Sequence, residues 1–449
     1  MTNLLSTISD FIWGLPLLLF LLTANIILIF YSKLIPLRGI KHSILLILGK
    51  FHTQDDEKDD GQISHFQALC NALAATIGLG NISGVAVAIY QGGAGAVFWM
   101  WVAAFLGMNT KFFECTLAVM YRGKDHTGQV QGGPMYYICE GMGSKFKILA
   151  LAFSIFGLIG TIAIFQTNQM AAFLEKGYGV NKGITGIVFG IVVAYILLGG
   201  LKRISDYTSK LVPTMSVLYF ILCSVILIMN IDSVPNVFIS IFTEAFSAKS
   251  ATGGAMGYGI MHIIQTGVKR AAFSNEAGVG TAPMAHGNAK TKEPISEGYV
   301  AMIGPFVDTI IVCTLTALVI LVSKQSEFVE LNGINLTTHA FTSNLGEVGR
   351  HLLGIIIFMF SFSTMIGMAN YNQKCWDFLF KGKFGLNEKM FIAFYSISLI
   401  LSAIVEMNSI VSLIDICYGL MAVPNIIATV FLAKKVKAAL ENYNSKYNV

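Results

Sequence analysis

The sequence contains few charged residues. Asp, Glu, Lys and Arg together make up 12% of its 449 residues, whereas a soluble domain carries roughly 25%. Hydrophobic residues make up 55% of the chain, and the mean hydropathy is +0.67. Apolar runs of about 18 residues or more recur from one end to the other. The composition therefore excludes an ordinary soluble domain and predicts an all-α polytopic membrane protein in a lipid bilayer.

Paired cysteines are also missing. The seven cysteines are scattered, with no CxxC pair and no metal-ligand spacing, so we expect them to pack as small hydrophobic side chains. Neither His262 nor His286 has a Cys, Ser or carboxylate at a spacing typical of a catalytic site. No repeat suggests a selectivity filter. These absences argue against a membrane-embedded enzyme and against a channel.

Basic residues are unevenly distributed among the loops. The net charge is +5, and the basic residues lie in short loops between apolar runs. This distribution indicates the positive-inside pattern rather than a nucleic-acid partner. The loop 33–65 carries Lys33, Arg38, Lys41, Lys50 and Lys58, whereas the opposite side has only Lys176, Lys182, Lys249, Lys324 and Arg350. This asymmetry predicts a multi-pass protein of the plasma (inner) membrane, with its N-terminus outside and its C-terminus in the cytoplasm.

The apolar runs predict eleven membrane spans. Their approximate ranges are 11–32, 65–91, 95–120, 146–173, 184–200, 211–230, 255–289, 297–323, 347–373, 390–406 and 409–433. The first span, with the loop after it, forms an N-terminal segment, 1–63. The other ten divide into two halves of five, 64–230 and 255–433, joined by an outside connection, 231–254, and followed by a cytoplasmic tail, 434–449. We interpret the halves as an inverted repeat.

Two stretches interrupt otherwise apolar spans with glycine and small polar residues. They are AATIGLGNISG, from Ala74 to Gly84, and GVKRAAFSNEAGVGTAPMAHGNAK, from Gly267 to Lys290. Glycine weakens a helix, and a broken backbone survives in lipid only where protein or a water-filled cavity satisfies it. Paired breaks in the two halves of a chain indicate a transporter's binding site.

Four motifs carry a family resemblance. FQALCNALAATIGLGNISG, GGAGAVFWMWVAAFLG from Gly92, GGPMYY from Gly132 and GVKRAAFSNEAGVGTAP from Gly267 together resemble the alanine or glycine:cation symporter family. The resemblance runs from about 64 to 425. It implies sodium-coupled symport of small neutral amino acids such as alanine and glycine by alternating access. It also implies a LeuT-like fold of the APC superfamily, with Na⁺ as the coupling ion and no organic cofactor.

The two breaks supply the candidate substrate contacts. Backbone N–H groups at a half-helix N-terminus bind carboxylates, and carbonyls freed at the preceding C-terminus suit an ammonium group or a cation. The candidates are Thr76, Gly78, Gly80 and Asn81 in the first break and Asn275, Gly278, Gly280 and Thr281 in the second. Gln166, in a polar cluster within a span, is a further candidate, and an interhelical hydrogen bond is its alternative role.

The family resemblance also implies a sodium site. In related sodium-coupled transporters, an adjacent Ser/Thr pair faces carbonyls of the first broken helix, which assigns Ser363, Thr364 and the carbonyls near Ala75 and Gly78 to sodium. The alternative is that both hydroxyls bond to their own helix. Where the family often has an aromatic residue, this chain has Met368, which could leave room for a larger neutral side chain.

Ionisable residues inside the spans are functional candidates. Arg270 precedes the second break, and Asp308, in the next span, is its predicted partner in an outer gate or a static clamp. A proton-coupled amino acid transporter on the same fold remains the alternative function. It would need an essential carboxylate in the cavity, such as Glu276 or Asp308.

Overall fold

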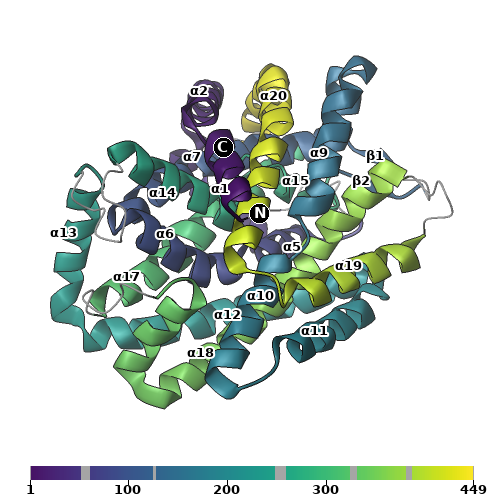
Figure 1. The fold of residues 1–449 in the computed structure, drawn as a ribbon. Helices are drawn as coiled ribbons and strands as arrows, with labels where there is room; N and C mark the ends of the chain where they lie inside the picture. Colours follow the sequence, from purple (N-terminus) through teal and green to yellow (C-terminus); the bar gives the residue numbers. More distant parts are fainter. Residues whose placement is uncertain are drawn as a thin grey trace.

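The computed structural model describes residues 2–51, 61–124, 128–247, 259–323, 331–380 and 387–447. Among these, the only strands are β1 (Gly123–Lys124) and β2 (Val130–Gln131), paired antiparallel, and nearly all the rest is helical (Figure 1). Of the predicted charge pattern, Lys58, Lys249 and Lys324 lie outside the described residues. So do residues 248–254 of the predicted connection and residues 255–258 of the predicted second half.

The described residues of the first half fold into twelve α-helices and four shorter π or 3₁₀ turns. The α-helices are α1 (Thr2–Ile12), α2 (Leu15–Ser32), α3 (Ile35–Arg38), α4 (Ile40–Ile47), α5 (His65–Thr76), α6 (Val85–Gly92), α7 (Gly95–Met120), α8 (Pro134–Tyr136), α9 (Lys147–Gly160), α10 (Ile164–Tyr178), α11 (Lys182–Leu197) and α12 (Gly200–Met229). The turns include η2 (Gly80–Gly84), η3 (Tyr137–Met142) and η4 (Ser144–Phe146), and η5 (Ile231–Ser233) follows α12.

In the second half, the part of the chain that the structure describes contains eight α-helices and one π-helical stretch. They are α13 (Val234–Glu244), α14 (Ile260–Asn275), α15 (Ala282–His286), α16 (Pro294–Pro305), η7 (Phe306–Cys313), α17 (Thr314–Val322), α18 (Ile334–Phe380), α19 (Glu388–Ser402) and α20 (Met407–Tyr447). The connection predicted at 231–254 is therefore partly helical, because α13 occupies it. A non-helical residue, Gly346, with φ 61°, divides α18.

The described part of the chain contains seven helices that are long and apolar enough to cross a membrane. The number is eight if α5 and η2–α6 are counted as one bent span. The predicted spans 184–200, 255–289 and 390–406 contain the shorter helices α11, α14 and α19, of 16, 16 and 15 residues. The multi-pass helical architecture is thus observed, while the count of eleven and the inverted repeat stay predictions.

Both predicted breaks are present. The first helix, α5, starts with a capping box in which Ser64 and Gln67 bond reciprocally. It stops at Thr76, and the chain resumes as η2–α6 at an angle of 50°. The second, α14, stops at Asn275. Gly278 and Gly280 follow with φ of 79° and 92°, a left-handed backbone that glycine adopts without the steric penalty of a Cβ.

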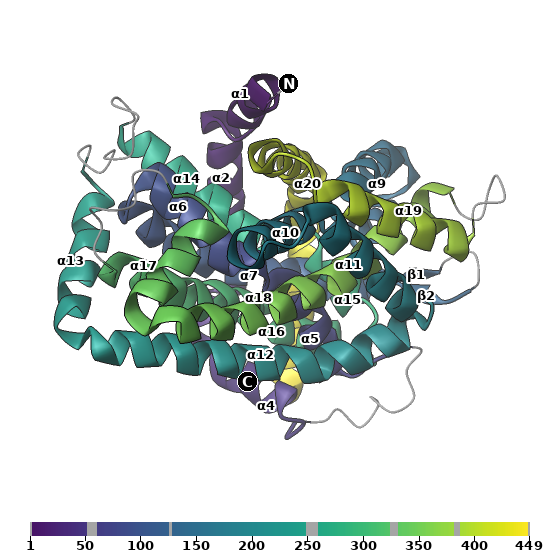
Figure 2. The same ribbon diagram turned by 60° about the horizontal axis from the view of Figure 1, so that its bottom comes forward.

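The broken helices lie at the centre of the bundle. Helix α5 packs against α12 and α18, while α14 packs against α6 and α7; α12 runs along one edge, beneath α18, in Figure 2. Helix α20 packs against α1 and α9. Large apolar side chains on the outer helices are exposed, including Phe30, Ile191 and Ile228, as expected of a surface that contacts lipid.

Candidate functional site

A small cavity lies beside the first break. Its lining comes from five parts of the chain, namely Ala75, Thr76, Gly80, Gly160, Ile162, Gln166, Phe273, Met368, Ile414 and Tyr418. Its volume is about 10 Å³, which is room for about one water molecule. The cavity is therefore nearly closed, and a ligand larger than water fits it only when the surrounding helices separate.

The cavity brings together several residues predicted from the sequence. Thr76, Gly80, Gln166 and Met368 all line it, together with Ala75. The Gln166 side chain is 6% exposed and lines the cavity. An amide inside an apolar bundle needs a hydrogen-bond partner, so Gln166 is suited to hydrogen-bond a ligand in this cavity. The Thr76 hydroxyl donates to Ala72 O, at 3.1 Å, and keeps acceptor capacity.

Five lining residues were missed in the sequence, namely Gly160, Ile162, Phe273, Ile414 and Tyr418. Phe273 belongs to the second break and packs edge to face on Phe165, with ring centroids 5.0 Å apart. Tyr418 and Ile414 come from α20. Phe273 sits within a motif already singled out, which was a usable signal. Nothing distinguishes Tyr418 or Ile414 from other apolar positions in their span, because only helix packing turns them toward the cavity.

Asn81 does not line the cavity. Its Oδ1 accepts from the Gly78 N–H, at 2.9 Å, and its Nδ2 donates to Asp308 Oδ1, at 2.7 Å, and to Ser274 Oγ, at 3.1 Å. Asn81 is fully buried. In this conformation it holds the first break against α14 and η7, so its side chain has a positioning role rather than contact with the cavity.

The predicted partner of Arg270 is wrong. Asp308 accepts hydrogen bonds from Asn81, Ser274 and Thr309, and Arg270 instead forms a buried ion pair with Asp415 of α20. Asp308 lies on η7, where both of its carboxylate oxygens are occupied. Arg270 and Asp415 are each close in sequence to residues that line the cavity, and the Arg270 guanidinium lies 5.2 Å from the centre of the Phe273 ring. The ion pair therefore lies beside Phe273, a residue that lines the cavity.

The other predicted residues of the second break face away from the cavity. The Asn275 amide donates to Thr309 Oγ1 and accepts from the Ala277 N–H, both at 2.9 Å. The Gly278 carbonyl accepts from Asn425 Nδ2, at 2.8 Å. A Cβ at Gly280 would meet Asn425 and two other side chains, so this position requires a close approach of the backbone. These residues shape the break and do not line the cavity.

Buried charges surround the second break. Glu276 accepts from Thr281 Oγ1, at 2.5 Å, and from the cavity residue Tyr418, at 3.1 Å. Lys111, which is 3% exposed, interacts electrostatically with Glu114, Glu276 and Asp308. A buried cation offsets part of the cost of burying carboxylates in an apolar bundle. The residues of this cluster therefore stabilise one another at the break.

The predicted Ser/Thr pair separates into two environments. Thr364 Oγ1 is buried and has no hydrogen-bond partner within the described residues, and a Cβ placed on Gly78 would collide with it. Ser363 instead donates to Phe360 O, at 3.0 Å, and lies 3.3 Å from Met215 Sδ. Thr364 thus faces the first break, while Ser363 bonds to its own helix. An orphaned hydroxyl beside a broken helix fits a hard cation such as sodium.

A second cluster anchors the far end of α5. His65 and His286 both hydrogen-bond the Glu297 carboxylate, and Ile63 forms a β-bridge with Ala289. No carboxylate partner was predicted for His286 at short spacing. In the structure its partner is Glu297, 11 residues further along the chain. This cluster joins the first broken helix to α15 and α16.

Comparisons with known proteins decide the family. The model for the sodium:alanine symporter family matches residues 1–448. The chain belongs to the sodium:alanine symporter family. The sodium/alanine symporter AgcS of Methanococcus maripaludis is 38% identical over 98% of this chain and 97% of its own length. The probable sodium/glutamine symporter GlnT of Bacillus subtilis is 34% identical over 97% of this chain and 89% of its own length.

A solved transporter shares the fold of this family member. The crystal structure of MhsT in complex with L-phenylalanine aligns with a TM-score of 0.58, over 83% of this chain and 89% of that one, at 14% sequence identity. The resemblance read from the motifs is confirmed, and the chain is a multi-pass amino acid symporter. In such a transporter, the small cavity at the first break is the candidate substrate site.

Proposed function

We propose that this protein couples the inward movement of sodium to the uptake of small neutral amino acids, such as alanine and glycine, by alternating access. One observation carries the proposal. Two polar side chains lie at the first break: Gln166, which lines the cavity, and Thr364, whose buried hydroxyl lacks a partner among the described residues. The first faces the cavity, and the second faces Gly78. One is suited to an amino acid and the other to a cation.

The proposed substrate contacts are Thr76, Gly80, Gln166 and Met368, with Phe273 and Tyr418 closing the cavity. The helix break places the backbone of Gly80 at the cavity wall, where N–H groups could bind a carboxylate. The proposed sodium ligands are Thr364 and the carbonyls near Ala75 and Gly78, where α5 ends and loses its helical acceptor partners. No metal or organic cofactor is needed beyond sodium itself.

Both broken helices belong to the proposed moving bundle. Asn81 and Asp308 join the first break to α14 and η7, so that the two breaks move together. We also propose the orientation predicted from the loop charges, with the N-terminus outside and the C-terminus in the cytoplasm, and the division into halves at 64–230 and 255–433.

Proton coupling is the alternative function. The carboxylates that it would use, Glu276 and Asp308, do not line the cavity, and each is held by hydrogen bonds within the protein. Uptake of labelled alanine into proteoliposomes, with sodium replaced by choline at two pH values, separates the functions. We expect uptake to stop without sodium at both pH values; uptake driven by a pH gradient in choline would favour proton coupling.

Replacing Gln166 with Ala should weaken substrate binding. The amide contributes hydrogen bonds to a charged ligand, each worth about 1.5–3 kcal/mol, so we expect KM for alanine to rise by roughly tenfold or more. The measurement is initial uptake at saturating sodium. Thr167→Ala is the matched control, because the Thr167 hydroxyl bonds within its own helix to Ala163 O. An unchanged KM in Gln166→Ala would show that Gln166 does not contact the substrate.

Met368→Trp should narrow the range of substrates. Met368 lines the cavity and is 5% exposed, so a larger and stiffer side chain leaves less room for the substrate's own side chain. We expect uptake of glycine to persist and uptake of larger neutral amino acids to fall by about tenfold, a difference typical of one or two methylene groups. Competition of unlabelled amino acids against labelled glycine measures it. Equal losses for all substrates would contradict a selective role.

A further inference from the structure

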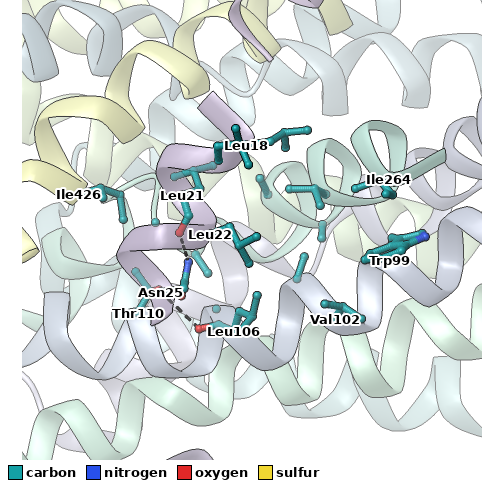
Figure 3. A pocket seen from close by; sticks show the side chains of 18 of the residues that line it. Leu18, Leu21, Leu22, Asn25, Trp99, Val102, Leu106, Thr110, Ile264 and Ile426 are labelled. Carbon is teal, nitrogen blue, oxygen red and sulfur yellow. Dashed lines mark hydrogen bonds between the residues drawn. The ribbon is translucent and has the colours of Figure 1, made fainter. Parts of the chain in front are cut away.

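A second and larger cavity lies between α2, α7 and α14. Its volume is about 290 Å³, nearly twice that of an apolar cavity of about 150 Å³ that binds benzene. Figure 3 shows Leu18, Leu21 and Leu22 of α2 facing Val102 and Leu106 of α7, with Trp99 toward one end. The first span, which lies outside the binding motifs, thus forms one wall of this cavity.

The lining is mostly apolar, and its polar side chains are already hydrogen-bonded within the protein. Thr110 Oγ1 donates to Asn25 Oδ1, at 2.6 Å, and Asn25 Nδ2 donates to Leu21 O, at 2.9 Å (Figure 3). Asn275 is held by Thr309 and by the Ala277 N–H. Because these side-chain amides and the hydroxyl are already paired, a zwitterion would find no partners here, and a wholly apolar cavity stays dry. The occupant is therefore apolar.

The cavity is continuous with the surface that faces the bilayer. Leu15, Leu19 and Leu22 of α2 and Met261 of α14 line it, and each is also between 44% and 51% exposed. These residues belong to a predicted span and to a helix of the membrane bundle, so their exposed faces contact lipid. Hydrocarbon chains surround this opening at high local concentration, and leaving a void of this size empty would forfeit many packing contacts.

We propose that this cavity binds an acyl chain of a membrane phospholipid. The chain enters between α2 and α14, lies along Val102, Ala103 and Leu106, and reaches the second break at Ala277 and Gly278. It packs against the backbone that forms the break, so the lipid acts as part of the support for the second broken helix. The site is separate from the small cavity at the first break, with which it shares no lining residue.

Quenching of tryptophan fluorescence by brominated acyl chains tests this site, because the bromine must come into contact with the indole. Two single-tryptophan proteins are made from the four tryptophans, Trp13, Trp99, Trp101 and Trp376, by Phe replacement. One keeps Trp99, which lines the cavity; the other keeps Trp101, on the same helix, which does not. Both are reconstituted into phosphatidylcholine vesicles with bromine at mid-chain. We expect stronger quenching of Trp99 than of Trp101.

Ala103→Phe supplies the decisive comparison, since its ring fills the cavity next to Trp99. We expect the additional quenching of Trp99 to be lost, falling to the level of Trp101, while quenching of Trp101 stays the same. Quenching of Trp99 that is unchanged by Ala103→Phe, or that never exceeds that of Trp101, would overturn the proposal. If Ala103→Phe does not elute as a folded protein, Val102→Phe fills the same cavity and is judged by the same outcomes.

Discussion

Replacing Thr364 with Val should raise the sodium concentration that half-saturates uptake by at least about tenfold, because a hydrogen bond or oxygen contact to a charge is worth about 1.5–3 kcal/mol. Val keeps the shape of Thr364 and removes only its hydroxyl oxygen. That oxygen is buried against Gly78 and has no partner among the described residues. Uptake of alanine as a function of sodium concentration, in proteoliposomes, measures the change.

Ser363→Ala is the matched control for this prediction. Ser363 is adjacent, equally buried and also hydroxylated, but its Oγ bonds to Phe360 O and lies against Met215. We expect its sodium dependence to stay within about twofold of the unmodified protein, as for a hydroxyl that bonds only to its own helix. If both variants lose sodium dependence equally, the cation lies between the two hydroxyls. If neither does, the sodium site is elsewhere.

Arg270→Ala should lower the free energy of unfolding by about 3–5 kcal/mol, because it removes the closest partner of a buried carboxylate and leaves only the Lys269 ammonium, 3.5 Å away, beside it. The charge left behind is Asp415, which is 3% exposed. Replacing both partners, with Arg270→Met and Asp415→Leu, should recover most of this loss. Thermal unfolding in detergent micelles measures all three proteins.

Lys269→Ala is the control for the ion pair. Lys269 is adjacent to Arg270, but its ammonium contacts Asp10, whose side chain is 77% exposed, and lies 3.5 Å from Asp415. Partly exposed pairs of this kind contribute about 1 kcal/mol or less, so a loss equal to that of Arg270→Ala would contradict the assigned partner.

Transport by the double variant decides between a gate and a clamp. A static clamp needs only a packed pair, so Arg270→Met with Asp415→Leu would recover uptake together with stability. An outer gate must form and break its ion pair during transport, so the double variant would regain stability without uptake. The gate hypothesis is contradicted if Arg270→Ala leaves both transport and sodium dependence unchanged.

Local sequence features predicted the position of a membrane span and of the two central helix breaks well. Span 95–120 coincides with α7, and both glycine-containing breaks occur where the sequence places them. Such features depend on hydrophobic length and on backbone freedom within a few residues. The break between α9 and α10, at Thr161 and Ile162, was not predicted, because the glycines before it, Gly157 and Gly160, do not form the Gly-x-Gly pattern of the two predicted breaks.

The residues of the candidate site were predicted less accurately than the helix breaks. Gln166 lines the cavity and Thr364 has an unpaired hydroxyl at the first break, as their positions in apolar spans suggested. Asn81 and Ser363 turn toward neighbouring helices, and Arg270 bonds to a residue 145 positions away instead of to Asp308. Tyr418 could not be found at all, since its role depends on which face of α20 meets α14.

The sequence by itself therefore determined that the chain is a helical membrane protein, where its two central helices break, and which family it resembles. Composition and glycine placement decide these properties within each segment. Only the tertiary structure decided which polar groups remain unpaired beside the first break, and that the first span encloses an apolar cavity behind the second. The rotation of each helix about its axis sets these pairings. A rotation smaller than the angle between successive residues is enough to move a side chain from one neighbouring helix to the next.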